Sequence, residues 1–288
     1  MDYNSLVDCF ALKNGVKVPC VGFGTWQTPD GNESMIAVKA ALDAGYRHID
    51  CASVYGNEQS IGAAISAYGL PRGDVFITSK LSNKVRGYDQ TIASFKKTLM
   101  DLRLDYIDLY LVHWPSPVAY RDRWEYWNAE SWRAFEDLCV EGAIRAIGVS
   151  NFHAHHLDAL CKTAKIKPMV NQIRLCPGGL QSDVVNASRE RGLLLEAYSP
   201  FGGSGRSNIL NDKVFLDLAA RYGKTPAQIC VRWCLQHDFL PLPKSATPAR
   251  ITNNADVFDF ELDSQDMELL NNLSGYSNPF PHPDNTTW

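Results

Sequence analysis

The chain has 288 residues, of which 28 are basic and 32 acidic, giving a formal net charge of -4. This mild charge argues against a protein that binds nucleic acid or an anionic membrane surface. No apolar run is long enough to cross a bilayer, and the N-terminus lacks the basic and apolar regions of a signal peptide, so we predict a cytoplasmic protein.

The length fits one large α/β domain or two ordinary ones. Eight cysteines are scattered along the chain, and none forms a C-x-x-C pair. Because disulfide frameworks are typical of small secreted chains, reduced and mostly buried thiols are the preferred interpretation. Cys230 and Cys234 share a predicted helix face, where core packing is the simplest role.

The first predicted element is a β-hairpin. Cys9 to Leu12 and Val16 to Pro19 flank Asn14-Gly15, a dipeptide typical of two-residue turns. Val21 to Gly24 is then expected to be a strand. It contains a Gly-x-Gly sequence, but no third glycine follows at the spacing of a dinucleotide-binding fingerprint, which argues against a Rossmann fold.

The stretch Gly45 to Glu58 contains a carboxylate and a tyrosine that are candidates for acid–base chemistry. Gly45 closes a helical pattern, as a left-handed cap residue does. His48 to Asp50 is a predicted short strand with the carboxylate at its end, and Tyr55 lies in the loop beyond it. A tyrosine can act as a general acid if a neighbouring lysine ammonium lowers its pKa.

From there on, apolar strands alternate with segments of helical periodicity. The further expected strands are Val75–Ser79, Tyr106–Val112, Ala146–Val149, Met169–Gln172, Leu193–Tyr198 and Leu240–Pro243. The expected helices lie around Met35–Leu42, Asn57–Tyr68, Ile92–Leu102, Trp132–Leu138, His153–Thr163 and Gln181–Arg191, with two more after Tyr198 and a last one capped by Asp263 and Ser264. The second of the two after Tyr198 begins with a capping box, Thr225 to Gln228.

Eight strands separated by helices imply a parallel sheet, and eight such units in this length predict one (β/α)8 TIM-barrel domain over residues 1–288. The N-terminal β-hairpin would cover the amino-terminal end of the barrel. An open doubly wound sheet is the alternative. It is disfavoured because polar residues follow many strands instead of gathering at one switch point.

The carboxyl ends of barrel strands meet at one mouth, where four candidate side chains would gather: Asp50, Tyr55, Lys80 and His113. Asp50 can hold the Lys80 ammonium, which can then lower the pKa of Tyr55. This set suits protonation of a carbonyl oxygen while a nicotinamide or flavin supplies hydride. Taken separately, Asp50 and Lys80 could form only a structural ion pair, and Tyr55 and His113 could be packed rings. The presence of all four at matching strand ends favours catalysis.

Three segments resemble the aldo-keto reductase superfamily: Gly45–Glu58, Leu102–Pro115, and Pro243–Ser245 with Arg250 and Asn254. Shorter motifs at Gly148–Phe152, Asn171–Gln172 and Tyr198–Pro200 add to the resemblance, which spans most of the chain. The resemblance implies a (β/α)8 barrel that uses NADPH without a Rossmann domain. It also implies a monomer that reduces a small-molecule carbonyl substrate, an aldehyde or ketone, to an alcohol.

The resemblance also implies individual roles. Tyr55 would be the proton donor, with Asp50, Lys80 and His113 completing a tetrad. NADPH would be bound by Thr25, Trp26, Asp50, Ser150, Asn151, Gln172, Tyr198, Ser199, Pro200, Phe201, Gly202, Lys244, Ser245, Arg250, Asn253 and Asn254. Of these, Lys244, Ser245 and Arg250 would bind the 2′-phosphate, which makes chemical sense because two cations and a hydroxyl can satisfy a dianion.

Trp26, Tyr55, His113 and Trp114 would contact the substrate, and the segments 115–130, 203–211 and 275–288 would set specificity. For Trp124 and Trp127, packing and substrate contact are equally favoured. The chain departs from the usual family residues at Cys51, Arg174, Cys176, Phe201 and Asn253, which leaves the tetrad intact and affects the adenine contacts and the polarity around the site.

His153, His155 and His156 invite a metal-site interpretation, but no carboxylate or cysteine completes the set. We therefore predict a solvated helix face there and no metal. Two functional alternatives stay open: a regulatory or structural protein that holds the cofactor with negligible turnover, and an enzyme that runs mainly as an alcohol or sugar dehydrogenase.

Overall fold

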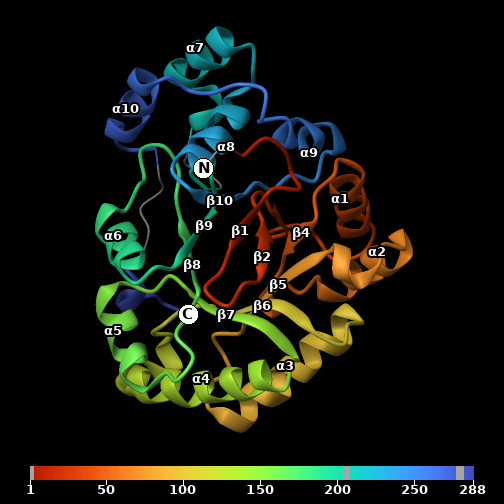
Figure 1. Ribbon diagram of the computed structural model, residues 1–288, viewed down its shortest axis with the longest axis vertical. Coiled ribbons are helices and arrows are strands. Elements are labelled where there is room, and N and C mark those ends of the chain that lie inside the picture. The colour runs from red at the N-terminus through yellow and green to blue at the C-terminus, as the bar shows by residue number, and fades with distance from the viewer. Residues whose placement is uncertain (1–2, 204–207, 277–281) are drawn as a thin grey trace.

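The computed structural model describes residues 3–203, 208–276 and 282–288 (Figure 1). Eight parallel strands surround a central axis, with helices outside them. The strands are β3 (Phe23–Gly24), β4 (His48–Asp50), β5 (Phe76–Leu81), β6 (Ile107–Val112), β7 (Ile144–Ser150), β8 (Val170–Arg174), β9 (Leu194–Tyr198) and β10 (Phe239–Leu242). Neighbours in sequence are neighbours in the sheet.

Backbone hydrogen bonds close the sheet on itself. The Gly22 N–H donates to the Pro241 carbonyl and the Gly24 N–H donates to the Pro243 carbonyl, both at 3.0 Å. These bonds join the first parallel strand to the last, and the (β/α)8 barrel predicted from the sequence is confirmed.

The outer helices are α1 (Asn32–Asp43), α2 (Glu58–Tyr68), α3 (Tyr88–Leu102), α4 (Trp124–Val140), α5 (Ala154–Thr163), α6 (Ser182–Glu190), α7 (Lys213–Tyr222), α8 (Pro226–Gln236), α9 (Pro248–Ala255) and α10 (Ser264–Asn272). The capping box at the start of α8 forms as predicted, with Thr225 and Gln228 bonding each other's backbone N–H. Helix α9 was not predicted, although Pro248 in its first turn is a start signal.

The N-terminal hairpin pairs β1 (Cys9–Ala11) with β2 (Lys17–Pro19). Its loop differs from the predicted two-residue turn. Leu12 N–H donates to the Val16 carbonyl at 2.9 Å, so the loop comprises Lys13, Asn14 and Gly15, and Gly15 takes the left-handed φ of 84° that glycine tolerates.

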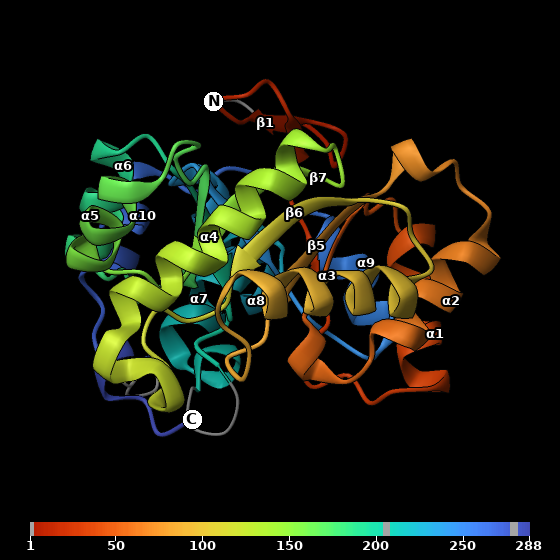
Figure 2. The ribbon, with the colours of Figure 1, turned by 90° about the horizontal axis from the view of Figure 1, so that it is seen from below.

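The hairpin covers the amino-terminal end of the barrel, as expected. The Asn14 side-chain amide donates to the Arg145 carbonyl near the start of β7, at 2.9 Å. The Lys13 ammonium donates to the Arg191 carbonyl, shortly before β9, at 2.6 Å. Figure 2 shows the hairpin at one end of the barrel and the C-terminus toward the opposite end.

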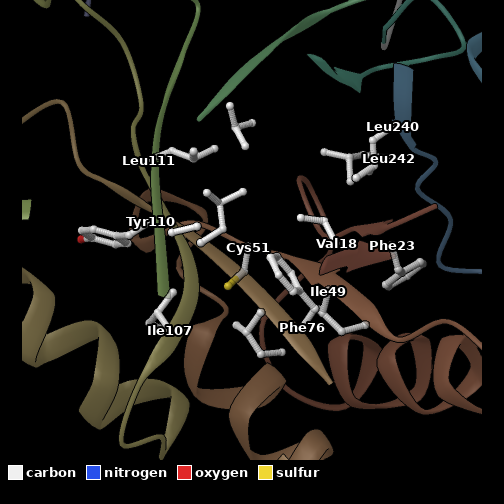
Figure 3. Close-up of a cluster of buried hydrophobic side chains, with 14 of the residues drawn as sticks. Val18, Phe23, Ile49, Cys51, Phe76, Ile107, Tyr110, Leu111, Leu240 and Leu242 are labelled. Carbon is white, nitrogen blue, oxygen red and sulfur yellow. The ribbon is translucent and has the colours of Figure 1, made fainter. Parts of the chain in front are cut away.

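The core lies between the strands and around them. Every residue of β6 is buried, as expected for a parallel strand covered on both faces. Figure 3 shows side chains of several strands, among them Ile49, Phe76 and Leu111, in one buried cluster. Cys230 and Cys234 are buried in a second cluster, which confirms their packing role, and all eight cysteines are free.

Within the described ranges, no helix combines the length and apolarity that a membrane span requires.

Candidate active site

Lys80 is the centre of a buried polar cluster. Its ammonium donates to both carboxylate oxygens of Asp50, at 2.7 and 2.8 Å, and to the Cys51 carbonyl at 3.0 Å. It also donates to the Tyr55 hydroxyl oxygen at 3.3 Å. The Lys80 side chain is 0% exposed and that of Asp50 is 5% exposed. The structure therefore brings together the first three predicted tetrad members.

The strand register explains this convergence. Asp50, the last residue of β4, pairs with Thr78 of β5, so Lys80 lies farther along β5 toward the barrel mouth. Tyr55 ends a single 3-10 turn (Ser53–Tyr55) that follows β4. Lys80 was predicted just beyond its strand, but β5 runs on to Leu81, and this regular backbone fixes the direction of the lysine.

Aromatic rings surround the Tyr55 phenol. Its ring centroid lies 5.9 Å from that of His113, the residue that follows β6, and 4.8 Å from that of Trp26. Trp26 is 50% exposed, so its indole lines the open side of the site. Trp114 packs edge-on against Trp288, with centroids 5.4 Å apart. The fourth tetrad member and both predicted substrate tryptophans thus lie at the same mouth.

Burial raises the pKa of Tyr55 to about 12, because desolvation outweighs the lowering effect of the Lys80 ammonium. Asp50 adds to the increase. The predicted effect of Lys80, which lowers the pKa of Tyr55, is therefore present, but desolvation is the larger effect and the net shift is upward. The phenol stays protonated at neutral pH, which is the form that a proton donor needs.

The pKa of His113 is lowered well below its ordinary value by burial, and then by the charges of Lys80 and Arg86. Its imidazole is therefore neutral and can donate a hydrogen bond without carrying a charge. Arg86, which sequence reasoning missed, is buried, and its guanidinium donates to the carbonyls of Ser82, Val85 and Trp114. It holds the backbone beside His113 while adding positive potential there.

A chain of polar contacts links the ends of β7, β8 and β9. The Ser150 hydroxyl donates to the Gln172 carbonyl at 2.8 Å, and the Asn151 amide donates to the His113 carbonyl at 3.0 Å. The Tyr198 hydroxyl donates to the Asn151 side-chain oxygen at 2.7 Å. Asn151 and Ser199 have left-handed φ values of 63° and 51°, a costly conformation that is concentrated at functional sites.

The predicted phosphate-binding residues lie beyond β10. Lys244 donates to the Gln27 carbonyl at 3.0 Å, and the Ser245 hydroxyl oxygen accepts the Thr247 N–H at 3.0 Å. Arg250 is exposed on α9. Among the residues that the structure describes, neither cation forms a salt bridge, so this donor set fits an anion such as a phosphate ester. Asn253 is exposed on α9 and Asn254 is buried there.

The remaining predicted residues have supporting positions. Thr25 donates its N–H and hydroxyl to the Asp50 carbonyl, at 3.1 and 2.8 Å. The loop after β9 carries Pro200 to Gly202 and turns through a bond from Gly202 N–H to the Ser199 carbonyl. Trp124 packs against His156 and Trp127 against Tyr120, with centroids 4.8 and 5.4 Å apart, which favours packing roles. Residues 204–207 and 277–281 of the predicted specificity segments lie outside the described residues.

Glu196 is a second residue that sequence reasoning missed. It is buried in β9, and the Gln172 side-chain amide donates both to its carboxyl at 2.7 Å and to Asp50 at 2.8 Å. Burial, and then the negative charge of Asp50, raise the pKa of Glu196 to about 8. A single acidic residue within the otherwise apolar strand Leu194–Tyr198 was the signal available in the sequence.

We predict that Glu196→Gln flattens the pH dependence of stability. Between the ordinary pKa of 4.5 and the folded value of about 8, the folded chain keeps a proton that the unfolded chain has lost. The free energy of unfolding of the wild type therefore falls by roughly a few kcal/mol as pH rises through this window. In the Glu196→Gln variant the side chain is neutral at every pH, so this decrease is absent. Urea unfolding across the window measures it, with the exposed Glu268→Gln as control. Parallel curves for wild type and Glu196→Gln would contradict the prediction.

Comparisons with known proteins agree with this geometry. The Aldo/keto reductase family model matches residues 20–274. The chain is 44% identical over 280 residues to a glyoxal reductase of Bacillus subtilis (strain 168), covering 97% of this chain and 98% of the relative. It also resembles a solved aldo-keto reductase from a Medee basin deep-sea metagenome library, with a TM-score of 0.91 and 39% identity; the match covers 97% of this chain and 100% of the other. A second solved structure, a Bombyx mori aldo-keto reductase in complex with NADP, matches with a TM-score of 0.83 and 32% identity. That match covers 94% of this chain and 98% of the other. The chain therefore belongs to the aldo/keto reductase family of oxidoreductases.

Proposed function

We propose that this chain is an NADPH-dependent reductase that converts aldehydes and ketones to alcohols, with Tyr55 as the general acid. The observation that carries the proposal is the 3.3 Å contact between the Lys80 ammonium and the Tyr55 hydroxyl, beside a neutral His113. The Bombyx mori relative solved with NADP supports the choice of cofactor class.

The nicotinamide, when bound, supplies hydride to the carbonyl carbon. The chain supplies the proton and the electrostatic support. Tyr55 donates its hydroxyl proton to the carbonyl oxygen as negative charge develops there. Lys80 stabilises the phenolate that remains, and Asp50 holds the lysine in place. His113 donates a hydrogen bond to the same oxygen and fixes its position, and Tyr55 then recovers a proton from solvent at the partly exposed mouth.

The cofactor-binding roles follow the polar strand ends. Ser150, Asn151 and Gln172 present amide and hydroxyl groups that suit a carboxamide, and Tyr198 offers a ring face for the nicotinamide. The Ser199–Gly202 loop would contact the pyrophosphate, and Asn253 and Asn254 the adenine. Lys244, Ser245 and Arg250 would bind the 2′-phosphate, which distinguishes NADPH from NADH.

A substrate panel tests the activity directly. NADPH absorbance is followed with glyoxal, a long-chain aldehyde, a keto-sugar and a quinone; glyoxal comes first because of the Bacillus subtilis relative named for it. We expect NADPH oxidation with at least the reactive aldehydes. No oxidation at high enzyme concentration would favour the cofactor-holding protein without turnover. Faster NADP+ reduction with the corresponding alcohols would favour the dehydrogenase direction.

We predict that Arg250→Ala weakens NADPH binding roughly 10- to 100-fold, because a charge-assisted hydrogen bond to a phosphate is lost. NADH binding should change little, since that cofactor has no 2′-phosphate. Titration of protein fluorescence with each cofactor measures both affinities. Arg133→Ala, an exposed arginine on α4, is the matched control. Equal weakening of NADPH and NADH would refute the assignment of Arg250.

A further inference from the structure

The C-terminal segment meets the start of α5 in a cluster of imidazoles around one carboxylate. His155 Nε2 lies 3.0 Å from Asp284 Oδ2, and His156 Nε2 lies 2.7 Å from Asp284 Oδ1. His282 Nδ1 lies 3.5 Å from Asp284 Oδ2. The sequence predicted a solvated histidine face without a carboxylate. The structure corrects the second point, because Asp284 reaches the cluster, and it corrects the first for His156, whose side chain is 0% exposed, while His155 is exposed as predicted.

The hydrogen bonds of His156 define its role. Its Nδ1 accepts the backbone N–H of His153 at 3.1 Å, so in the neutral ring the proton is on Nε2, which donates to Asp284 Oδ1. The buried imidazole of His156 thus holds one carboxylate oxygen, Oδ1, and so orients the Asp284 carboxylate. Asp284 Oδ2 is left facing His155 and His282, whose side chains are 50% and 46% exposed.

The distances around Asp284 are close to those of a metal site, and ligand atoms of His155, His156 and Asp284 all lie within 4.8 Å of one another. Two ligands bound to one zinc ion at about 2.0–2.2 Å in tetrahedral geometry lie about 3.3 Å apart. The distances from Asp284 Oδ2 to His155 and to His282, 3.0 and 3.5 Å, fall on either side of that value. The rings of His155 and His282 are nearly parallel, at 8°, with centroids 6.3 Å apart. His282 Nδ1 also accepts the Asp284 backbone N–H at 3.4 Å, so coordination through this nitrogen would replace that hydrogen bond.

We propose that His155, His282 and Asp284 bind a divalent transition-metal ion, Zn²⁺ in the first instance, with His156 orienting the carboxylate. Imidazole nitrogen with one carboxylate oxygen favours zinc over calcium or magnesium, which require mostly oxygen ligands. Water completes the coordination, because both coordinating histidines are half exposed.

Such an ion would fasten the segment 282–288 to α5. From Asp284 the chain continues to Thr286, whose carbonyl accepts a bond from Arg121 at 2.6 Å, and to Trp288, whose carbonyl accepts the Val118 N–H at 3.1 Å. Trp288 packs on Trp114, next to His113. One consequence rests on the proposed reductase function. Bound metal should change the KM for bulky carbonyl substrates more than it changes kcat.

Zinc binding to the full chain without an affinity tag, measured by calorimetry, tests the proposal. Co²⁺ is the spectroscopic probe, because its absorbance separates nitrogen and oxygen ligands from the thiolates of the free cysteines, including Cys161 on α5. We expect one site in the wild type. Asp284→Asn and His155→Ala should each weaken it at least about 10-fold, and His156→Asn about 10- to 100-fold, as measured for residues that orient ligands.

Two control variants should bind as tightly as wild type: Cys161→Ser and the exposed Asp89→Asn. Circular dichroism confirms folding, which the isosteric Asp284→Asn preserves. Absence of binding, equal binding by wild type and Asp284→Asn, or a thiolate charge-transfer band that Cys161→Ser removes would each overturn the proposal. A chain that binds zinc but does not oxidise NADPH would support the metal site and refute the reductase, so the two failures are distinguishable.

Discussion

Tyr55→Phe is expected to bind NADPH as tightly as wild type and to reduce aldehydes about 100- to 10,000-fold more slowly. The substitution removes the hydroxyl that the Lys80 ammonium contacts at 3.3 Å, and with it the proton that the carbonyl oxygen receives. General acid catalysis contributes about this factor. Single-turnover NADPH oxidation measures the rate, and fluorescence titration measures cofactor affinity.

Tyr106→Phe is the matched control for Tyr55→Phe. Tyr106 directly precedes β6, so it lies at the amino-terminal end of the barrel, away from the mouth, and its ring packs on Arg72. We expect wild-type turnover from it. If Tyr55→Phe also turned over at the wild-type rate, the proton would come from another group, and the mechanism proposed for this site would be wrong.

Lys80→Met is expected to lower the free energy of unfolding by about 3–5 kcal/mol at neutral pH. It leaves the Asp50 carboxylate buried, and within the described residues the Gln172 amide is the one side chain that still donates to it. An uncompensated buried charge costs about this much. Urea unfolding measures the change. The double variant Asp50→Asn with Lys80→Met should regain much of the loss, because it removes the unpaired charge.

The control for Lys80→Met is Lys97→Met. Lys97 also pairs with an aspartate, Asp101, but its side chain is 64% exposed, so the loss should stay below about 1 kcal/mol. A Lys80→Met protein as stable as wild type at neutral pH would contradict the prediction that Lys80 compensates the buried carboxylate of Asp50.

The alternation of strand and helix was enough to predict the barrel, because local patterning determines each unit and eight units fit one closed sheet. The predicted carboxyl ends of the strands then indicated which side chains meet at the barrel mouth, among them Asp50 and His113. The pKa of Tyr55 could not be predicted in the same way. Its direction depends on the balance between desolvation and the Lys80 charge, which only the depth of the phenol decides.

Other features escaped prediction for equally physical reasons. Helix α9 has only eight residues and buries two apolar side chains, Ile251 and Ala255, so its amphipathic pattern is too short to recognise from sequence. The contact between His155 and Asp284 spans 129 positions in the sequence, and no local pattern reports so distant a partner. Glu196 was visible as a lone acid in an apolar strand, but its link to Asp50 through Gln172 required the sheet register.

The hydrogen bonds from Gly22 and Gly24 to Pro241 and Pro243 have a consequence for biosynthesis. During translation the edge of β3 stays unpaired until β10 has left the ribosome, and such non-local pairing slows folding. A nascent chain stalled before β10 presents two bare sheet edges, which attract other chains. Chaperone demand should therefore be highest just before β10 is synthesised.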